Sequence, residues 1–537
     1  MQIKSFKFIF SVIVSLAILL LPIYFQLKYS LDAEVLNNDY ADLHLGHALS
    51  LDFWIRGYNE DRSGYFAITH PGLLFQIFSW LIYFFVNIAT WFHTNGIDLA
   101  ASTLTNSFIF FLMSSVTSSV LLCFCLFWTA FRLKFFHLIP LIGILYGITG
   151  EYTHTFIHFT NDYFAIPLIL IWALVWKNVK NPLNSIQFYL NLGLLSSLVY
   201  LNKLPYIVWI LSFFVTLVCF GIVQRKLIIL GGVIVYTLTF LLATFVLSTI
   251  FFGSEGFLHM VSSHKALFSN SGRMGAGSHT FIDFSTLVSN FKYFLSTNNI
   301  FSTITIFLLV LFILYTAVFK KLFDGYSFKA VLLKLDPLVV WAIIAFFGGF
   351  LATLKHYGYN YLLVALSPLL LASFIVYTKR YYSIYLFFMV ITLFSVIFNV
   401  AFNERFFKFN SIESQNLKET YKELSTDPSI IFITEYRNPT KQFTTFHTLF
   451  CSDLPQKEII YSKIFPNSYV YYFEDPKFFS GPQKLIKEEL KWDYWVSVYK
   501  ADGLDWYSLD RFNYLSENTE FITKPSRKSI SIFKRTR

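Results

Sequence analysis

The stretch IILGGVIVYTLTFLLATFVLSTIFF, residues 228–252, contains no charged side chain over its 25 residues. A helix of that length, at about 1.5 Å per residue, is long enough to cross the roughly 30 Å hydrocarbon core of a bilayer. Two basic residues, Arg225 and Lys226, stand just before it. The stretch therefore predicts a membrane-spanning helix that begins on the inner side of the membrane.

The rest of the chain has the same character. Hydrophobic residues make up 55% of the 537 residues and charged residues only 14%, a composition that lipid solvates and water does not. Apolar runs of about spanning length recur and predict eleven membrane helices, the first of them retained. The runs lie at residues 8–25, 104–131, 136–150, 162–176, 186–201, 204–222, 228–252, 301–319, 337–354, 361–377 and 383–402.

The basic residues between these runs select an orientation. If residues 73–92 form a juxtamembrane or re-entrant helix on the outer face, fourteen Lys and Arg but only two acids fall on the inner side. This asymmetry is typical of inner loops. Eleven of the twelve histidines, all but His137, then lie on the outer side, so any chemistry is expected there. The predicted outer loops are 26–103, 150–162, 253–300 and 354–360.

The last part of the chain has a soluble composition. Residues 403–537 hold twenty bases and eighteen acids, so the net charge of +10 comes mostly from the inner loops and requires no nucleic acid. We predict an all-α polytopic domain over 1–402 and a small extracytoplasmic α/β domain over 403–537. Strands are expected at 429–434, 457–462, 468–473 and 493–499, and a helix at 482–491.

Asp39 begins the first group of candidate site residues, because it follows the first span where the chain emerges into water. Asp39 and Asp42 have i, i+3 spacing, as do His44 and His47, so one helical face would present several of them together. The alternative is an acidic, solvated loop.

The second outer loop ends in Asp162, an acid that abuts the apolar run beginning at Tyr163. A carboxylate there is costly unless it is paired, bound to metal or faces a wet cavity. The alternative is an ordinary helix cap. His154 and His158, at i, i+4, are spaced to bind a metal, but without a clear third ligand they also fit a surface helix.

Cationic residues mark the two remaining outer loops. An amphipathic helix is expected over 257–265, followed by a glycine-rich segment, and Lys265 and Arg273 would supply donors for a phosphate. A flexible connector is the alternative. Lys355 and His356 end a predicted span just before Tyr359. An interfacial aromatic belt explains the tyrosine, whereas a bound anion better explains an outer lysine.

Four motifs occur in one order along residues 1–380: the outer acid Asp39, the stretch His70-Pro71-Gly72-Leu73-Leu74, the acid of Thr160-Asn161-Asp162, and Lys355-His356 before Tyr361–Pro368. This order resembles the membrane-embedded GT-C glycosyltransferases, a superfamily that includes the protein O-mannosyltransferases and the lipid A aminoarabinose transferases. The sequence departs from that pattern in having one proline at 70–72 and no paired Asp-Glu at 38–39.

The resemblance implies transfer of a sugar from a polyprenyl-phosphate donor to a lipid, glycan or protein acceptor at the outer face. A lipid-linked glycan ligase or polymerase, or a flippase or transporter, is the alternative. No cofactor is required by the sequence, although a divalent cation on Asp39 and Asp162 would be compatible with it. The implied roles are catalysis for Asp39 and Asp162, donor-phosphate binding for Lys355, His356, Arg273 and Lys265, and substrate binding for Asp42, His70, His158 and Tyr359.

The compartment follows from the same features. The chain lacks any permitted Asn-x-Ser/Thr glycosylation acceptor, and its Phe, Ile, Asn, Lys and Tyr bias is typical of bacteria. We therefore expect a bacterial inner-membrane protein with its site and its C-terminal domain outside the cytoplasm.

Overall fold

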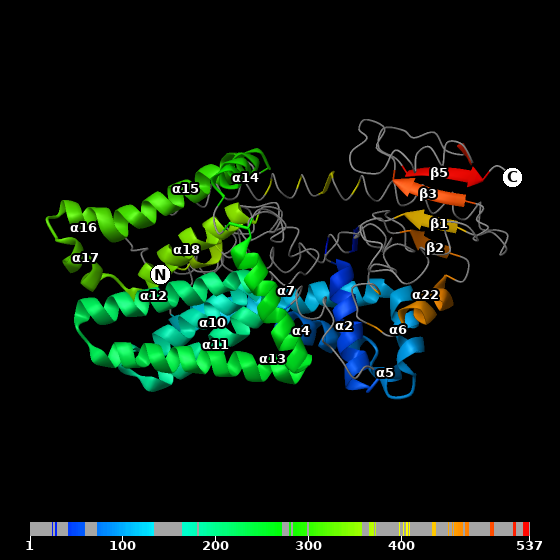
Figure 1. Cartoon of the computed structure of the whole chain (residues 1–537), viewed down its shortest axis with the longest axis horizontal. Helices are drawn as coiled ribbons and strands as arrows, with labels where there is room; N and C mark the ends of the chain where they lie inside the picture. Colours follow the sequence, from blue (N-terminus) through cyan, green and yellow to red (C-terminus); the bar gives the residue numbers. More distant parts are fainter. Residues whose placement is uncertain are drawn as a thin grey trace, which may run out of the picture. The chain divides into compact units, whose positions relative to one another are not determined.

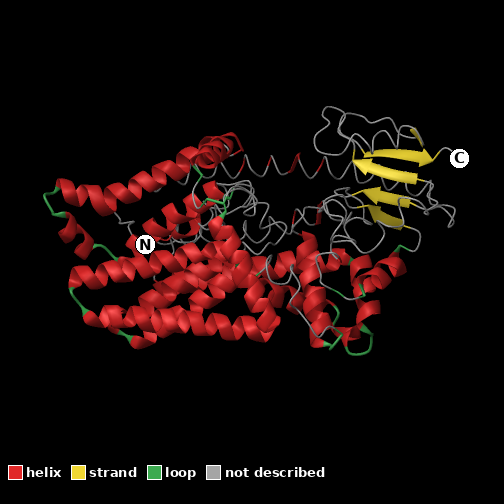
Figure 2. Cartoon of the chain, in the orientation of Figure 1, coloured by secondary structure: helices red, strands yellow, loops and turns green. Residues whose placement is uncertain are grey.

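A computed structural model gives the arrangement of the chain (Figures 1 and 2). It describes residues 24, 27–28, 41–58, 72–133, 164–179, 182–270, 279–280, 283–297, 300–356, 365–369, 371, 397, 401, 404–405, 408, 432–435, 449, 454, 456–465, 468–471, 494–498, 519–521 and 530–535. The chain forms two compact units. Unit 1 comprises residues 1–24, 60–79 and 113–404, and unit 2 comprises residues 25–59, 80–112 and 405–537.

Helices make up nearly all of the described part of the first 404 residues. They are α2 (Ala41–Ile55), α4 (Leu73–Val86), α5 (Ile88–Trp91), α6 (Gly96–Thr105), α7 (Ser107–Leu133), α10 (Ala165–Asn178), η2 (Pro182–Asn184), α11 (Ile186–Asn202), η3 (Leu204–Tyr206), α12 (Ile207–Gln224), α13 (Leu227–Ser269), α14 (Phe284–Thr297), α15 (Ile300–Leu314), the short π-helix η5 (Tyr315–Phe319), α16 (Lys320–Phe323), α17 (Phe328–Lys334) and α18 (Pro337–Lys355).

Four helical segments of the described residues are long and apolar enough to cross a membrane, which agrees with the predicted membrane class of the chain. The segments are Ser107–Thr129, Leu204–Gln224, Leu227–Ser262 and Pro337–Lys355. The described parts of the predicted runs at 162–176, 186–201 and 301–319 are also largely helical, in α10, α11 and α15 with η5. The runs at 8–25, 136–150 and 383–402, and most of 361–377, lie outside the described residues, so the number of eleven stays a prediction.

An aromatic cluster forms the core of unit 1. Trp172 of α10 stacks on Trp341 of α18, with ring centroids 5.1 Å apart, and the Trp341 indole N–H donates to the Trp209 carbonyl at 2.9 Å. Phe213 of α12 meets Trp172 edge-on at 5.5 Å. All these rings are buried. Large rings in edge-on and stacked contact hold α10, α12 and α18 together.

Small residues let α11 and α13 approach closely. A Cβ added to Gly193 would lie 2.7 Å from Thr239, and one added to Gly232 would lie 2.1 Å from the Tyr189 ring. The Ser196 and Tyr236 hydroxyls share a hydrogen bond of 2.8 Å across the same contact. Close backbone approach and interhelical hydrogen bonds are what stabilise helices in lipid, where no hydrophobic force drives them together.

α13 has a break that the sequence places correctly. Gly253 has φ +73°, which interrupts the helix between the predicted span 228–252 and the predicted amphipathic helix 257–265. A side chain is rarely tolerated at such a φ, so glycine allows the change of direction seen in Figure 1.

The predicted inner loops gather at one end of unit 1. Figure 1 shows the α12–α13 turn, α16 and α17 at this end, and they carry Arg225, Lys226, Lys320, Lys321, Lys329 and Lys334. Lys177, near the end of α10, pairs with Asp336 at 2.5 Å, and Asp336 caps the start of α18. α18 therefore begins at the basic end of unit 1, and Lys355 lies a full 19-residue helix away.

Unit 2 contains a five-stranded sheet with the order β2-β1-β3-β5-β4. β1 (Phe432–Glu435) is parallel to β2 (Ser468–Tyr471) and to β3 (Tyr494–Val498), whereas β5 (Ile530–Arg535) is antiparallel to β3 and to β4 (Thr519–Phe521). In the register, Ile433 lies opposite Tyr469 and Trp495. The expected strand at 457–462 is wrong, because these residues lie in the helix α22 (Lys457–Ile464). The expected helix at 482–491 lies outside the described residues.

Two regions far apart in the sequence belong to unit 2 together. α22 packs on α6, and Lys463 forms an ion pair with Asp98 there. Unit 2 thus includes residues 25–59 and 80–112 of the predicted first outer loop as well as residues 405–537. A separate domain with its boundary at residue 403 stays a prediction.

Candidate functional site

α18 ends in two buried polar residues. The helix starts with Asp336, whose side chain accepts from the Leu338 N–H at 3.0 Å, and with Pro337 in the first turn, a combination typical of helix starts. Apolar residues then follow up to the last turn. Lys355 and the C-cap His356 are each only 8% exposed. A cation at the end of an apolar helix is therefore held against the protein instead of extending into solvent.

A neighbouring helix fixes this last turn. The final carbonyls of a helix have no partner within it. Here the Asn290 side-chain amide of α14 donates to the Leu354 carbonyl at 2.6 Å, and Phe294 meets Phe350 edge-on at 5.5 Å. α14 thus sets the position of the backbone that carries Lys355 and His356.

A second lysine, Lys203, lies at the same end of unit 1. Lys203 is the C-cap of α11, and η3, which begins at the next residue, contacts α18. Gly348, two turns before Lys355, packs against Val208 just after η3. Sequence reasoning missed Lys203, although it carried the same signal as Lys355, a lysine that ends an apolar run on the predicted outer side.

Gly72, the last residue of the His70-Pro71-Gly72 motif, lies at this end of unit 1 as well. A Cβ on Gly72 would lie 1.8 Å from the Cα and the carbonyl oxygen of Asn202, so no other residue fits at position 72 without moving the backbone. Asn202 directly precedes Lys203 and is fully buried. The start of α4 and the end of α11 are therefore in backbone contact. His70 itself lies outside the described residues.

His264 attaches the second part of α13 to the same region. Its Nδ1 shares a hydrogen bond with the Tyr200 hydroxyl of α11, and the two rings meet edge-on at 5.2 Å. Burial lowers the pKa of His264 from 6.5 to about 4. Lys265, the next residue, is exposed. The predicted amphipathic helix is thus fastened to α11 two residues before Asn202.

We expect this contact to weaken in acid. Because the folded pKa of His264 lies below 6.5, the unfolded chain binds the proton first, so the stability of this contact is complete above pH 6.5 and is lost as the pH falls toward 4. The loss is about 1.4 kcal/mol per pH unit in that window. His264→Gln, which cannot titrate there, should lack this dependence. Thermal unfolding in detergent near neutral pH and at about pH 5 checks it, and identical pH dependence in both proteins would contradict it.

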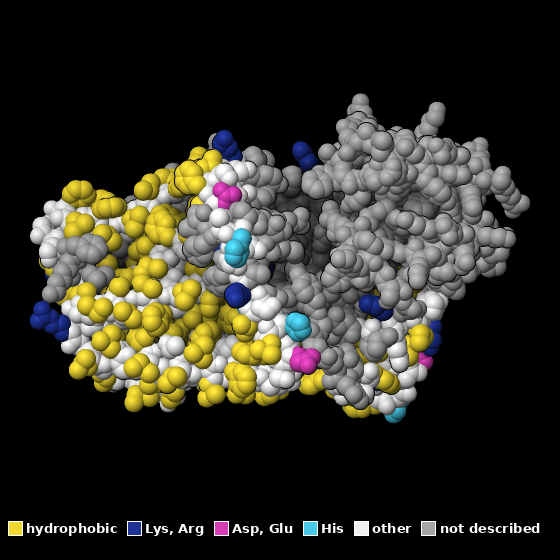
Figure 3. All heavy atoms as spheres, viewed as in Figure 1, with side chains coloured by type: hydrophobic (Ala, Val, Ile, Leu, Met, Phe, Trp, Pro, Cys, Tyr) yellow, Lys and Arg dark blue, Asp and Glu magenta, His cyan; other side chains and the backbone are white. Residues whose placement is uncertain are grey.

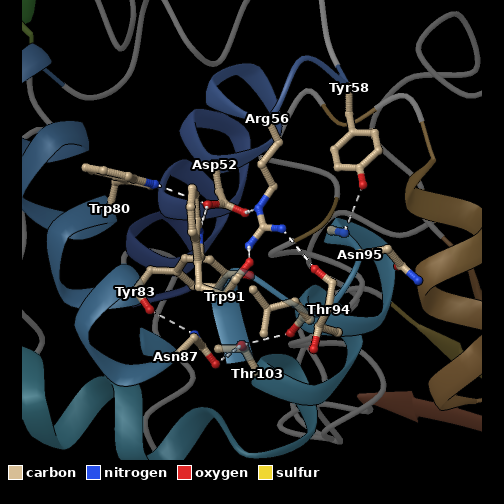
Figure 4. A network of polar contacts seen from close by, with 12 residues as sticks. Asp52, Arg56, Tyr58, Trp80, Tyr83, Asn87, Trp91, Thr94, Asn95 and Thr103 are labelled. Carbon is tan, nitrogen blue, oxygen red and sulfur yellow. Dashed lines mark hydrogen bonds and ion pairs between the residues drawn. The ribbon is translucent and has the colours of Figure 1, made fainter. Parts of the chain in front are cut away.

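Unit 2 holds a separate polar network centred on Asp52 of α2 (Figure 4). The Asp52 carboxylate accepts from two indole N–H groups, Trp91 at 2.6 Å and Trp80 at 3.2 Å, and pairs with Arg56 at 2.8 Å. Arg56 in turn donates to the carbonyls of Thr94 at 3.0 Å and Trp91 at 2.8 Å. The Arg56 guanidinium lies 4.3 Å from the centre of the Trp91 ring.

This network joins α2 to α4, to α5 and to the turn before α6. Burial raises the pKa of Asp52, while the Trp91 N–H and the Arg56 charge act in the opposite direction. Among the residues that the structure describes, the polar contacts of this cluster all lie within residues 41–105, and the Asp52 side chain is 0% exposed. We interpret it as a structural clasp that fixes α2, and hence the chain that follows Asp39, on the rest of the first outer loop.

His44, His47 and Ser50 of α2 are buried too. His44 and His47 are both 0% exposed, and the His44 ring packs on Phe110 at 4.7 Å. Burial lowers the pKa of His44 to about 3, so it is neutral. His44 and His47 thus have the predicted helical spacing within α2, and both side chains are buried. Residues 44–53 are buried, so the alternative of a solvated loop is wrong for this part of the chain.

The structure leaves several predicted residues untested. Lys355, His356 and Lys265 are described, and Asp42 lies in the first turn of α2. Those outside the described residues are Asp39, Asp162, Arg273, His70, His158 and Tyr359. Within the described ranges, no three His, Cys, Asp or Glu side chains come close enough to hold a metal ion; Asp39 and Asp162 are not among them.

No model of a known protein family matches this sequence, and no curated protein matches it.

Proposed function

We propose that the protein transfers a sugar from a polyprenyl-phosphate donor to an acceptor at the outer face of a membrane. The observation that carries this proposal is the pair Lys355 and His356, buried at the end of an apolar helix of spanning length, with Lys203 at the same end of unit 1. Charge in such a place is costly and is a functional hypothesis by default. A phosphate at the membrane surface is the ligand that suits it.

The donor requires three environments at once. Its polyprenyl tail stays in lipid, its phosphate lies at the interface and its sugar reaches water. Apolar α18, the cationic end formed by Lys203 and Lys355, and the outer loops supply these three. This distribution of polarity supports a lipid-phosphate substrate over a soluble one.

The reaction follows from the proposed groups. The acceptor hydroxyl oxygen forms a bond to the sugar carbon, and the bond from that carbon to the phosphate oxygen breaks. The phosphate leaves with the electron pair, and fixed cations such as Lys355 stabilise its growing negative charge. The hydroxyl proton passes to a carboxylate, for which Asp39 is the proposed base and Asp162 the second catalytic acid. Arg273, Lys265 and His356 are further candidates for the phosphate, and Asp42, His70, His158 and Tyr359 for the substrates.

The close contact at Gly72 accounts for one departure from the GT-C pattern. That family has a second proline where this chain has Gly72. A pyrrolidine ring would collide with the Asn202 backbone, because even a Cβ would lie 1.8 Å away. The departure is therefore compatible with a retained role of the motif.

Orientation and acceptor complete the proposal. Eleven spans, an outer site, an extracytoplasmic C-terminal α/β domain and a bacterial inner membrane follow from the loop charges and the composition. The acceptor is a lipid, a glycan or a protein, and a divalent cation is compatible with Asp39 and Asp162. A lipid-linked glycan ligase or polymerase would use the same kind of donor and differs only in its acceptor.

Replacing Lys355 by methionine tests the carrying observation. The substitution keeps the apolar stem but removes the charge, so we expect the affinity for a short-chain polyprenyl phosphate to fall by about tenfold to a hundredfold, the range for a lost charge-assisted hydrogen bond. Microscale thermophoresis of the purified protein in detergent measures it. Lys226→Met, at the opposite end of unit 1, is the matched control and should bind normally. Equal affinities of both variants for the polyprenyl phosphate would show that Lys355 does not bind the donor phosphate.

A further inference from the structure

α14 has three distinct faces. One faces α18, through the Asn290 contact with the Leu354 carbonyl and through Phe294, which is 4% exposed. A second face carries polar residues only, Ser285, Ser289 and Lys292, all exposed and spaced i, i+4 and i+7. A helix at the surface of a water-soluble protein needs only two such faces, one packed and one polar.

The third face is apolar and uncovered. Phe284 is 77% exposed, Val288 39% and Leu295 45%, and Phe291 lies half-buried between them. Their spacing, i, i+4, i+7 and i+11, places all four on one line along the helix. Contact with water along this whole line would be unfavourable.

The next helix along the chain, α15, also exposes an apolar face. α15 begins three residues after α14 ends and exposes Ile304, Phe307 and Leu311, again on one face. Figure 3 shows apolar side chains over the outside of α13 and α15. In Figure 1, α14 is foreshortened while α15 runs lengthwise, so the two axes diverge.

We propose that α14 lies in the membrane–water interface, with Phe284, Val288, Phe291 and Leu295 inserted beneath the lipid head groups and Lys292 among the lipid phosphates. A helix with one apolar face and a polar face beside it binds in that plane. Phospholipid is the occupant because the next helix, α15, also exposes an apolar face, and because four helical segments of the described chain are long and apolar enough to cross a membrane. A protein partner would need about 800 Å² per side, more than one line of four side chains on a helix about 21 Å long provides.

This docking affects the candidate site through Asn290. Because Asn290 holds the Leu354 carbonyl, insertion of α14 into lipid would fix the last turn of α18 and therefore Lys355 and His356. The proposal requires only that the chain is a membrane protein. It stands or falls separately from the transfer of a sugar.

Two adjacent residues provide a matched test. Val288→Cys and Ser289→Cys, in a chain whose four native cysteines are serine, are labelled with an environment-sensitive fluorophore and reconstituted in phosphatidylcholine nanodiscs. Lipids brominated near the head-group end of the acyl chain should quench the label at 288 several times more strongly than the label at 289. Equal, weak quenching at both positions would overturn the proposal, as would disulfide crosslinking of two copies through position 288.

A second measurement uses the native chain, in case the cysteine-free protein does not fold. Phosphatidylcholine with a photoreactive acyl chain is incorporated into the nanodiscs, and the adducts are mapped by mass spectrometry. We expect adducts on Phe284, Val288 and Leu295 and none on Ser285 or Ser289. Adducts confined to the exposed side chains of α15, with α14 unmodified, would refute the interfacial position.

Discussion

Asp52→Ala is expected to destabilise the clasp of unit 2 by about 3–5 kcal/mol, the cost of removing one member of a buried ion pair. The Arg56 guanidinium would stay in its site with two carbonyl partners and no counter-charge, and the Trp80 and Trp91 indoles would lose their common acceptor. Amide hydrogen exchange in α2 and α5 measures the effect directly. The corresponding increase in exchange rate is about a hundredfold to a few thousandfold.

The control for Asp52 is another ion pair of the same unit. Asp98 pairs with Lys463 between α6 and α22, but both side chains are nearly half exposed. Solvent screens such a pair, so Asp98→Ala should change exchange in α2 very little. Similar exchange for Asp52→Ala and the unmodified protein would show that the three side-chain contacts of Asp52 with Trp91, Trp80 and Arg56 do not stabilise the loop.

Asp39→Asn should abolish transfer almost completely while expression and donor binding stay normal. The amide keeps the shape and hydrogen-bonding capacity of the carboxylate but cannot take up the proton of the substrate hydroxyl. A general base contributes roughly a hundredfold to ten-thousandfold to the rate. Turnover of a short-chain polyprenyl-phosphate sugar by the purified variant checks this prediction.

Two other carboxylates act as comparisons for Asp39. Asp42→Asn should have a milder effect, because Asp42 lies in the first turn of α2 and only a substrate-binding role is proposed for it. Near-normal turnover of Asp39→Asn together with an inactive Asp162→Asn would assign the base to the second outer loop. Normal turnover of all three would argue against the proposed reaction.

Features that depend on local composition could be predicted from the sequence. Lipid requires long uncharged runs, so the α7, α12, α13 and α18 spans were recognisable from their length alone. The break at Gly253 followed from the end of one apolar run and the start of an amphipathic pattern. In the tail, by contrast, the apolar residues of 457–462 fit a strand and a helix equally well, and α22 formed because it packs on α6.

Features that depend on distant partners could not be predicted. The contacts of Asp52 are one example, because its partners Trp80 and Trp91 lie 28 and 39 residues away in the sequence. The burial of His44 by Phe110 has the same origin. Lys355 could be recognised because a lysine is unusual at the end of an apolar run. Asn290 could not, because its role depends on the packing of α14 on α18, where it donates to the Leu354 carbonyl in the last turn of α18.

Release of polyprenyl phosphate tests the central claim most directly. The purified protein is incubated with short-chain polyprenyl-phosphate sugars and an extract of cell-envelope lipids and glycans as acceptors, and free polyprenyl phosphate is measured by mass spectrometry. We predict release that depends on the acceptor and is lost in Asp39→Asn and strongly reduced in Lys355→Met. Absence of release from every donor, or release that is unchanged in both variants, would contradict a sugar transferase whose donor phosphate binds at the end of α18.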